Sequence, residues 1–272
     1  KLNALSYEMI ELLYGQLLKW KDDENVAIII IEGEGDKAFC SGGDVRHLYD
    51  KKDSNIEEYA FGFFYTEYSM NMTMHLYPKP ILVYMNGIVM GGGVGVAVAG
   101  SHRIVNERTK WAMPEMNIGL YPDVGGSYFL NKMPGHIGRY LALTSKAINS
   151  ADVLYIGAAD YYIKSSFWKD LRQAISEKTW TIDSAEKELN VLLNKFSETP
   201  AMSPSIAELE EKINFHFRFE TIEEIVKALE ESAENGDEWA ADVVKTILSK
   251  SPTSLKVTLR QLIEGKKKSM LD

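Results

Sequence analysis

Residues 85–126 contain the groups best suited to acid–base chemistry. Three consecutive glycines, Gly91, Gly92 and Gly93, let backbone N–H groups approach a ligand closely, because glycine has no Cβ atom. Two acids, Glu115 and Asp123, follow in residues 111–126, which are otherwise uncharged. Two carboxyl groups in one site can hold a water molecule and move a proton, so this stretch predicts an acid–base site. Taken singly, each acid could instead be structural, one at the end of a strand and the other in a turn after a proline.

A second glycine-containing loop precedes this stretch. Ser41, Gly42 and Gly43 follow a short apolar strand, and a helix is expected to begin near Asp44. The first N–H groups of a helix have no partner inside it, so those of Gly43 and Gly92 would be free to bind a ligand. Two such donors aimed at one oxygen would form an oxyanion hole. The alternative is that both loops are ordinary glycine turns.

The composition limits the partners of this chain. It has 272 residues, 45% of them hydrophobic and 25% charged, which is typical of a folded globular protein. A net charge of −9 argues against nucleic acid as a bulk partner, because phosphate binding needs a basic surface. A local basic pocket for one phosphorylated small molecule remains compatible with that charge. Residues 80–101 are uncharged, yet their glycines disfavour a lipid-exposed helix, so we expect no membrane span.

Neither a metal nor a nucleotide cofactor is predicted. The single cysteine, Cys40, allows no internal disulfide and has no histidine partner in a motif that would make it a nucleophile. Gly33 and Gly35 superficially match a dinucleotide-binding fingerprint, but the helix that this fingerprint requires does not follow. The histidines show no spacing typical of metal ligands; they are His47, His75, His102, His136 and His216.

Periodicity predicts an α/β part followed by a helical part. Apolar, β-branched runs at residues 26–31 and 81–85 are typical of buried strands, whereas residues 3–20 and 56–74 have helical apolar spacing. Strand, turn and helix recur, which indicates repeated ββα units over residues 1–163. Residues 164–272 show no convincing strand pattern and are predicted to form a helical C-terminal region. Its expected helices span residues 205–215, 221–232, 238–250 and 254–264.

Three motifs together resemble the crotonase, or enoyl-CoA hydratase/isomerase, superfamily. They are AFCSGGD at residues 38–44, NGIVMGGGVGVA at residues 86–97 and MPEMNIGLYPDVGGSYFL at residues 113–130. The resemblance implies a spiral of ββα units that binds an acyl-CoA thioester. It also implies that the N–H groups of Gly43 and Gly92 form an oxyanion hole for the thioester carbonyl. The loop on the adenine side of coenzyme A would be formed by Gly43, Asp44, Val45 and Arg46.

Within that superfamily the sequence departs from the hydratase pattern. Gly95 stands where hydratases have a glutamate that acts on water, and Asp123 stands where they usually have a small residue. Together with Glu115, this combination is similar to the 3-hydroxyisobutyryl-CoA hydrolase family. The segments FFYTEY at residues 63–68 and SPTSLKVTLRQLIEG at residues 251–265 resemble the same family.

The hydrolase resemblance implies roles for individual residues. Glu67, Gly92, Glu115 and Asp123 would bind the substrate, and Glu115 and Asp123 would be catalytic. Glu115 would act as nucleophile or as general base on water, while Asp123 would hold the water or protonate the leaving thiolate. Glu67 would bind the 3-hydroxyl group or orient water. From the residues alone, Glu67 could equally be a solvent-facing or salt-bridged acid on a helix.

The implied reaction is hydrolysis of a short 3-hydroxyacyl-CoA thioester to the 3-hydroxy acid and free coenzyme A, as in valine degradation. The expected substrate is 3-hydroxyisobutyryl-CoA, with 3-hydroxypropionyl-CoA as the alternative. Coenzyme A is part of the substrate, so no further cofactor is expected. The competing functions are an enoyl-CoA hydratase or isomerase and a non-catalytic acyl-CoA-binding protein. A homo-oligomer is compatible with the superfamily. With no transit peptide visible, we expect a cytoplasmic protein, or a protein of the mitochondrial matrix in a eukaryote.

Overall fold

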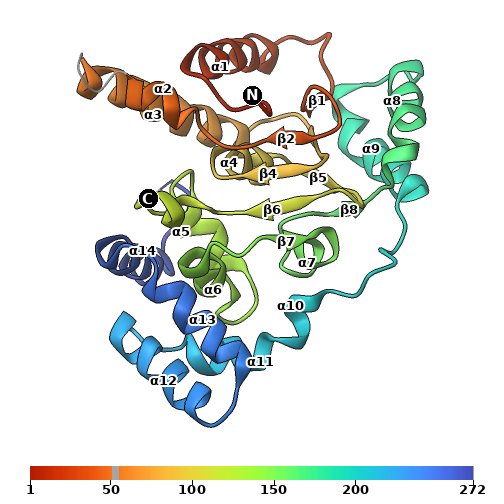
Figure 1. Cartoon of the computed structure of the whole chain (residues 1–272). Coiled ribbons are helices and arrows are strands. Elements are labelled where there is room, and N and C mark those ends of the chain that lie inside the picture. The colour runs from red at the N-terminus through yellow and green to blue at the C-terminus, as the bar shows by residue number, and fades with distance from the viewer. Residues whose placement is uncertain (51–54, 272) are drawn as a thin grey trace.

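The strands of the protein form two four-stranded sheets in a computed structural model that describes residues 1–50 and 55–271 (Figure 1). The first sheet has the order β1 (Ile29–Glu32), β3 (Ile81–Met85), β5 (His102–Val105) and β8 (Tyr161–Tyr162). The second has the order β2 (Ala38–Cys40), β4 (Ile88–Met90), β6 (Lys110–Ala112) and β7 (Ile148–Asn149).

The chain winds through these sheets as a spiral. Strands β1 and β2 form one turn, β3 and β4 the next, and β5 and β6 the third, so each turn adds one strand to each sheet. Neighbouring strands of successive turns are parallel, as in the pairs β1–β3 and β2–β4, and only β7 runs antiparallel to its neighbour β6 among the paired strands described. The expected α/β fold, a crotonase-like spiral of ββα units followed by an α-helical C-terminal region, is therefore confirmed.

Strand β3 shows why a continuous apolar run predicts a buried strand. Successive side chains of a strand point to opposite faces of its sheet. Ile81, Val83 and Met85 belong to the main apolar core, whereas Leu82 and Tyr84 belong to a second, smaller one. Helices α8 (Trp168–Glu177) and α9 (Ile182–Phe196) cover that second face. Both faces of β3 are thus covered, and all five of its side chains are buried.

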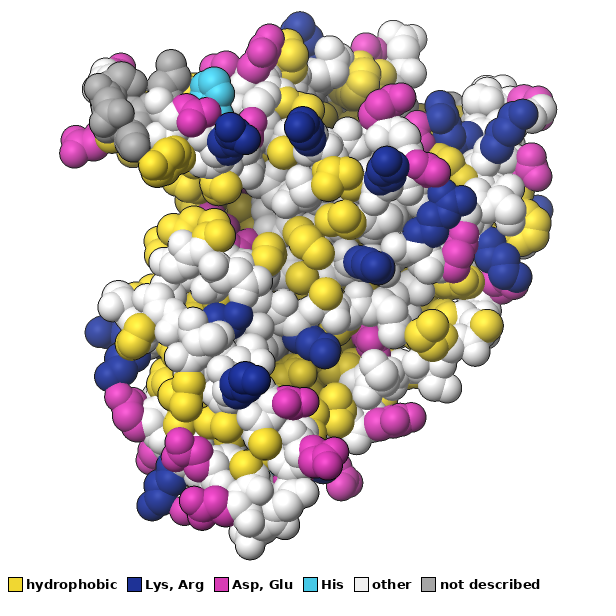
Figure 2. All heavy atoms as spheres, in the orientation of Figure 1, with side chains coloured by type: hydrophobic (Ala, Val, Ile, Leu, Met, Phe, Trp, Pro, Cys, Tyr) yellow, Lys and Arg dark blue, Asp and Glu magenta, His cyan; other side chains and the backbone are white. Residues whose placement is uncertain are grey.

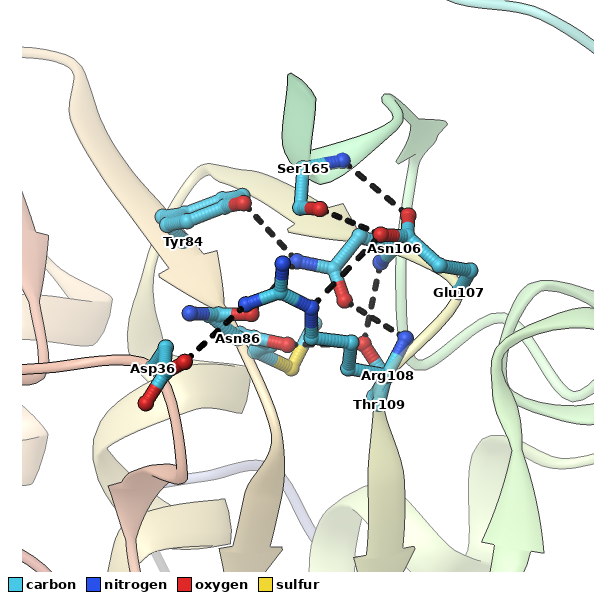
Figure 3. Close-up of polar contacts among 9 residues, drawn as sticks. Asp36, Tyr84, Asn86, Asn106, Glu107, Arg108, Thr109 and Ser165 are labelled. Atoms are coloured by element: carbon cyan, nitrogen blue, oxygen red, sulfur yellow. Dashed lines mark hydrogen bonds and ion pairs between the residues drawn. The ribbon is translucent and has the colours of Figure 1, made fainter. Parts of the chain in front are cut away.

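Polar side chains close the sheets where β3 and β5 end (Figure 3). Asn106 follows β5 and is fully buried, and its amide nitrogen donates to the Tyr84 hydroxyl and to the Asn86 side chain. The hydroxyl of Thr109 donates to the carbonyl oxygen of Met85 at the end of β3. These buried groups thus satisfy one another's hydrogen bonds inside the core.

Four helices from the first 100 residues pack on the spiral and carry several of the predicted site residues. They are α1 (Tyr7–Lys21), α2 (Val45–Asp50), α3 (Ile56–His75) and α4 (Gly92–Ala99). The Ser6 side chain accepts the N–H of Met9 and caps the N-terminus of α1. Helix α3 packs against both α1 and α4, and α4 begins at the glycine cluster. This packing brings the middle of α3 next to the first turn of α4.

The remaining helices follow the third turn of the spiral, and the long ones lie at the bottom of Figure 1. They are η1 (Glu115–Ile118), α5 (Gly126–Phe129), η2 (Leu130–Lys132), α6 (Ile137–Thr144), α7 (Ser150–Tyr155), η3 (Ser165–Phe167), α10 (Ser205–Glu208), α11 (Glu210–His216), α12 (Ile222–Glu234), α13 (Glu238–Leu248) and α14 (Pro252–Gly265). In the described part of the chain, no helix combines the length and the apolar character needed to cross a bilayer.

The boundary between a core at residues 1–163 and a helical region at residues 164–272 stays a prediction. The last strand described, β8, ends at Tyr162, and helices follow it. The main apolar core nevertheless contains residues of both regions, such as Leu141 and Leu259. The helical region therefore shares its core with the spiral.

Several local elements differ from the sequence-based expectation. The buried strand predicted over residues 26–31 is β1 at Ile29–Glu32, and only Ile29 of it is buried. Strand β4 lies between Gly87 and the glycine cluster, where no strand was predicted. Helices α8 and α9 were not predicted as helices. The helix predicted over residues 205–215 is broken at Leu209 into α10 and α11. None of these differences alters the segments that carry the predicted site.

Candidate active site

A pocket of about 250 Å³ lies where the loop before α2, the middle of α3, the start of α4 and η1 meet. Figure 2 shows a hollow in the surface below α2 and α3, with hydrophobic side chains on both sides of it. The three acids and two glycines that the sequence singles out all line this pocket; they are Glu67, Glu115, Asp123, Gly43 and Gly92. The fold therefore brings these five predicted residues together.

Gly43 and Gly92 lie side by side at the floor of the pocket. A Cβ atom on Gly92 would lie 3.3 Å from the backbone nitrogen of Gly43. Gly92 is the first residue of α4, so no helical carbonyl is available to its N–H. Within residues 1–50 and 55–271, neither of the two N–H groups donates a hydrogen bond to the backbone or to a side chain. Both are free for a ligand oxygen, which is what an oxyanion hole requires.

Glu67 points from α3 into this pocket. Its side chain is 2% exposed, and its Oε1 atom would lie 2.5 Å from a Cβ atom on Gly92, so a glycine there makes room for it. Oε1 has no hydrogen-bond partner among the described residues. Burial raises the pKa of Glu67 to about 8, and the charges of Asp123 and Glu115 add to the rise. The alternative of a solvent-facing or salt-bridged helical acid is therefore wrong.

Glu115 begins the short helix η1, three residues after Ala112 at the end of β6, and is not a strand-end acid. Its side chain is buried, and Oε1 lies 2.8 Å from the position of a Cβ atom on Gly91. Oε2 has no hydrogen-bond partner in the described part of the chain. Burial raises the pKa of Glu115 to about 8; its own backbone N–H opposes the rise, and the Asp123 charge adds to it.

Asp123 is held by a tyrosine from α3. The Tyr68 hydroxyl donates to Asp123 Oδ2 at 2.7 Å. Burial raises the pKa of Asp123, whereas the bonds from Tyr68 and from its own backbone N–H lower it. The next residue, Val124, has a φ of 43°, a region that β-branched side chains rarely adopt. Such strained turns concentrate at functional sites, where the surrounding structure holds them.

The three acids influence one another's pKa values unequally. The charge of Asp123 raises the pKa of Glu67 and of Glu115, whereas neither glutamate contributes to the shift of Asp123. Asp123 thus ionises first, and both glutamates keep their protons up to about pH 8. Burial, and not an acidic neighbour, raises the pKa of Asp123. One base beside neutral acids can accept a proton at one atom and supply one at another.

The space beside Gly95 is filled by other residues. A Cβ atom there would lie 2.5 Å from Val124 Cβ and 2.9 Å from Asn71 Nδ2. Real Cβ atoms do not approach other atoms so closely, so a glutamate at this position would force its neighbours to move. The structure therefore lacks both the second carboxyl group of the hydratase pattern and the room for one.

The predicted coenzyme A loop is divided between the pocket and the surface. Gly43 and Val45 line the pocket, and the Val45 side chain is 44% exposed. Asp44 accepts the N–H of His47 at the start of α2 and does not line the pocket. Arg46 is exposed and lies next to the pocket-lining Val45. A role of these four residues in coenzyme A binding stays a prediction.

Cys40 lies under the glycine cluster rather than in the pocket. Its sulfur accepts the N–H of Gly42 at 3.4 Å, and burial raises the pKa of its thiol to about 11. A thiolate is therefore not available at neutral pH. Across the described residues, no group of three His, Cys, Asp or Glu side chains is placed to hold a metal ion.

Three residues at the site escaped the sequence-based prediction. Tyr68 binds Asp123, Val124 fills the space at Gly95, and Asn71 lies one helical turn after Glu67. Asn71 is four positions after Glu67 on α3, so helical spacing from a candidate acid was its one available signal. Tyr68 directly follows Glu67 and carried no such signal. Val124 offered no signal, since its strain is a property of the folded turn.

Comparison with known proteins gives a consistent assignment. The chain matches the family model described as enoyl-CoA hydratase/isomerase over residues 1–272. It is 40% identical over 274 residues to the mitochondrial 3-hydroxyisobutyryl-CoA hydrolase of Homo sapiens, covering 99% of this chain and 69% of that protein. It is also 38% identical over 280 residues to the small ribosomal subunit protein mS47 of Neurospora crassa, covering 98% of this chain and 55% of that protein. The chain thus spans about half the length of the fungal protein.

Two solved structures share the fold over nearly the whole chain. One is a carnitinyl-CoA dehydratase from Mycobacterium thermoresistibile, with a TM-score of 0.88 and 32% identity over 99% of this chain and 75% of that one. The other is an enoyl-CoA hydratase from Rhodobacter sphaeroides, with a TM-score of 0.87, 32% identity and the same coverage of both chains. The resemblance read from the sequence motifs is confirmed: the chain belongs to the enoyl-CoA hydratase/isomerase, or crotonase, family.

Proposed function

We propose that this protein hydrolyses a short 3-hydroxyacyl-CoA thioester, with 3-hydroxyisobutyryl-CoA as substrate, to the 3-hydroxy acid and free coenzyme A. The observation that carries the proposal is the arrangement of acids around the paired glycines. Asp123 and Glu115 are present, whereas the space at Gly95 is closed by Val124. The similarity to the human 3-hydroxyisobutyryl-CoA hydrolase supports the same assignment. No cofactor beyond the coenzyme A of the substrate is part of the proposal.

In the proposed reaction the thioester oxygen accepts hydrogen bonds from the N–H groups of Gly43 and Gly92. Asp123 takes a proton from water while the water oxygen bonds to the carbonyl carbon. The carbon–sulfur bond then breaks, and Glu115 gives its proton to the departing thiolate sulfur. A proton passes from Asp123 back to Glu115 to restore the resting site. The backbone donors stabilise the oxyanion, which is typically worth about 3–4 kcal/mol for each donor.

The order of ionisation favours this route over attack by Glu115 on the carbonyl. A nucleophilic carboxylate must be ionised, yet burial keeps the proton on Glu115 up to about pH 8. Asp123, which ionises first, accepts the Tyr68 hydroxyl and is the better base at neutral pH. A single turnover in H₂¹⁸O separates the routes. Direct attack by water labels the acid at once, whereas first attack by Glu115 can leave unlabelled enzyme oxygen in the first product.

Glu67 is proposed to bind the 3-hydroxyl group of the acyl chain. It lies against Gly92, close to where the carbonyl is bound, and its Oε1 atom has no partner in the described part of the protein. As a neutral carboxylic acid it can donate and accept one hydrogen bond each. A site built to bind a hydroxyl group rejects the analogue without it by about 10⁴–10⁵-fold. We therefore expect strong preference for 3-hydroxyacyl over unhydroxylated acyl thioesters.

A second candidate function is non-catalytic binding of an acyl-CoA or of a protein partner, and the name of one relative points to such a role. One relative of 38% identity is named a small ribosomal subunit protein. The net charge of −9 gives no support to direct contact with RNA over a large surface. Glu67 and Glu115 are buried, and each has a carboxyl oxygen without a partner among the described residues. Such groups are costly in a protein that only binds or scaffolds, so their presence supports catalysis.

One assay separates hydrolase, hydratase and binding protein. We expect free thiol to appear when the protein is mixed with 3-hydroxyisobutyryl-CoA, at a rate proportional to protein concentration. A change in enoyl-CoA absorbance without free thiol would instead identify a hydratase. Binding of the ligand with neither change would identify a non-catalytic protein. Glu115→Gln serves as the matched control for a contaminating thioesterase, because it should bind the substrate and release no thiol.

The setting of the reaction is also a proposal. The human relative is named mitochondrial, so we propose the mitochondrial matrix if the source is a eukaryote and the cytoplasm otherwise. Whether the chain forms a homo-oligomer is tested by sedimentation of the purified protein.

A further inference from the structure

Asn71, a second polar side chain of α3, lies one helical turn beyond Glu67 and takes no part in the reaction described above. It is 1% exposed, so it is removed from solvent as completely as the apolar residues around it. Neither its amide nitrogen nor its amide oxygen has a hydrogen-bond partner among the described residues. Buried amides are nearly always paired, so both atoms need a partner that is not a protein group.

The packing of α3 on α4 places Asn71 in the same groove as Glu67. Glu67 and Asn71 are four positions apart and share one face of α3, while Gly92 and Gly95 are three apart and share one face of α4. Glu67 Oε1 lies 2.5 Å from the position of a Cβ atom on Gly92, and Asn71 Nδ2 lies 2.9 Å from that on Gly95. The two glycines thus form a groove that receives the two polar side chains, one after the other.

Asn71 stands on the wall between the candidate active site and a neighbouring cavity. It lines a cavity of about 330 Å³ together with Tyr68 and Val124, whereas Glu67 lines the catalytic pocket. The two side chains do not bond to each other directly, since neither Glu67 Oε1 nor either amide atom of Asn71 has a partner in the described structure. One water molecule would satisfy all three atoms by donating to Glu67 Oε1 and to Asn71 Oδ1 and accepting from Asn71 Nδ2. Buried waters typically make about three hydrogen bonds of this kind.

We propose that Asn71 is a positioning residue for Glu67 and acts through one bridging water molecule. The water occupies one of the two acceptor positions of Glu67 Oε1 and holds the carboxyl group against Gly92, which leaves the remaining positions of that carboxyl group for the acyl hydroxyl group. This inference rests on the proposed function, in which Glu67 binds that hydroxyl. It assigns Asn71 a part in substrate selection although the residue does not line the catalytic pocket.

The test is a double-mutant cycle between Asn71 and Glu67. Asn71→Leu removes both amide atoms at similar volume and should lower kcat/KM for 3-hydroxyisobutyryl-CoA by about 10- to 100-fold. In the Glu67→Gln background the same change should have little further effect, because the group that Asn71 positions has already been altered. Thermal stability should be unchanged or higher in Asn71→Leu, since no protein hydrogen bond is lost. A purely structural asparagine would instead lower stability and reduce both backgrounds equally.

The matched control is Thr66→Val on the same helix. The Thr66 hydroxyl donates to the Gly62 carbonyl of its own helix, so its loss should leave the rate unchanged. If Asn71→Leu does not fold, Asn71→Ser is used instead. Its hydroxyl group can still bind the water molecule, so this variant should retain part of the wild-type rate. Full activity of Asn71→Leu, or equal losses in both Glu67 backgrounds, would overturn the inference.

A crystal structure separates this inference from the proposed function. We expect an ordered water about 3 Å from Glu67 Oε1 and from the Asn71 amide, and its loss in Asn71→Leu. If the wild-type protein releases no thiol, the proposed function fails while the water can still be observed. If thiol is released but well-ordered density at this position contains no water, the function stands and the role of Asn71 is refuted.

Discussion

Glu115→Gln should inactivate the protein and stabilise it at the same time. Burial raises the pKa of Glu115 from an ordinary value of 4.5 to about 8. At pH 7 the unfolded chain releases this proton, whereas the folded protein retains it. Over the roughly 2.5 pH units between 4.5 and 7, at about 1.4 kcal/mol per unit, the carboxyl group disfavours folding by about 3 kcal/mol. A neutral glutamine of the same shape removes that cost.

The stability gained by Glu115→Gln should depend on pH in a definite direction. A carboxyl group whose pKa rises on folding contributes its full stability below the unfolded pKa and loses it as the pH rises through the folded pKa. The advantage of Glu115→Gln should therefore be absent near pH 4, grow between pH 4.5 and about 8, and stay constant above that. A gain of about 3 kcal/mol corresponds to roughly 5–10 °C in Tm for a chain of this size.

The assay is thermal unfolding of the wild type and Glu115→Gln at a series of pH values, beside thiol release at pH 7. Glu264→Gln is the matched control, because the Glu264 carboxylate pairs with Arg260 at the exposed surface. Its removal should not stabilise the protein at any pH. A Glu115→Gln variant that is less stable than the wild type at pH 7, or equally stabilised at pH 4, would refute the burial argument.

Three further substitutions test other parts of the site. Tyr68→Phe removes the bond to Asp123 Oδ2, so the pKa of Asp123 should rise further and the acid limb of the pH–rate profile should move to higher pH; an unmoved limb would exclude Asp123 as the base. Gly92→Ala places a methyl group 2.5 Å from Glu67 Oε1 and should lower kcat by about 100-fold or more while Tm changes little. A large fall in Tm together with the fall in kcat would indicate that the glycine is structural. Gly95→Glu should destabilise the fold by about 1–3 kcal/mol, measured by urea unfolding, and create no hydration of enoyl-CoA; a stable variant with hydratase activity would contradict the packing at Val124.

The glycines and acids of the site could be predicted because motifs carry them. Gly43, Gly92, Glu115 and Asp123 stand in short segments whose order and composition are specific, and the fold brings these segments to one pocket. Glu67 was harder, because a glutamate on a helix is usually exposed. Its burial follows from the close approach of α3 to α4, which depends on Gly92 having no side chain.

The charge states could not be predicted from the sequence. Which acid keeps its proton depends on burial and on a tyrosine that lies 55 positions away from Asp123 in the chain. Asn71 was likewise invisible, since an asparagine on an apolar helix gives no sign that both its polar atoms lack partners. These properties arise from tertiary packing and are absent from local patterns.

The differences in the fold have two kinds of cause. Strand β4 has only three residues and depends on pairing with β2 and β6, so no local periodicity indicates it. Helices α8 and α9 did carry a readable signal, because Leu171 and Ile175 are spaced four apart, as are Leu189 and Leu193. The helical period of these two helices is therefore present in the local sequence.

The central claim is tested most directly by the position of the oxygen taken from water. The protein is incubated with 3-hydroxyisobutyryl-CoA in H₂¹⁸O, and the acid product is analysed by mass spectrometry. We predict one ¹⁸O atom in the carboxyl group of the product and one free coenzyme A for each acid formed. An intact thioester, or ¹⁸O at the C3 hydroxyl group of recovered substrate, would contradict thioester hydrolysis, and the second result would identify a hydratase.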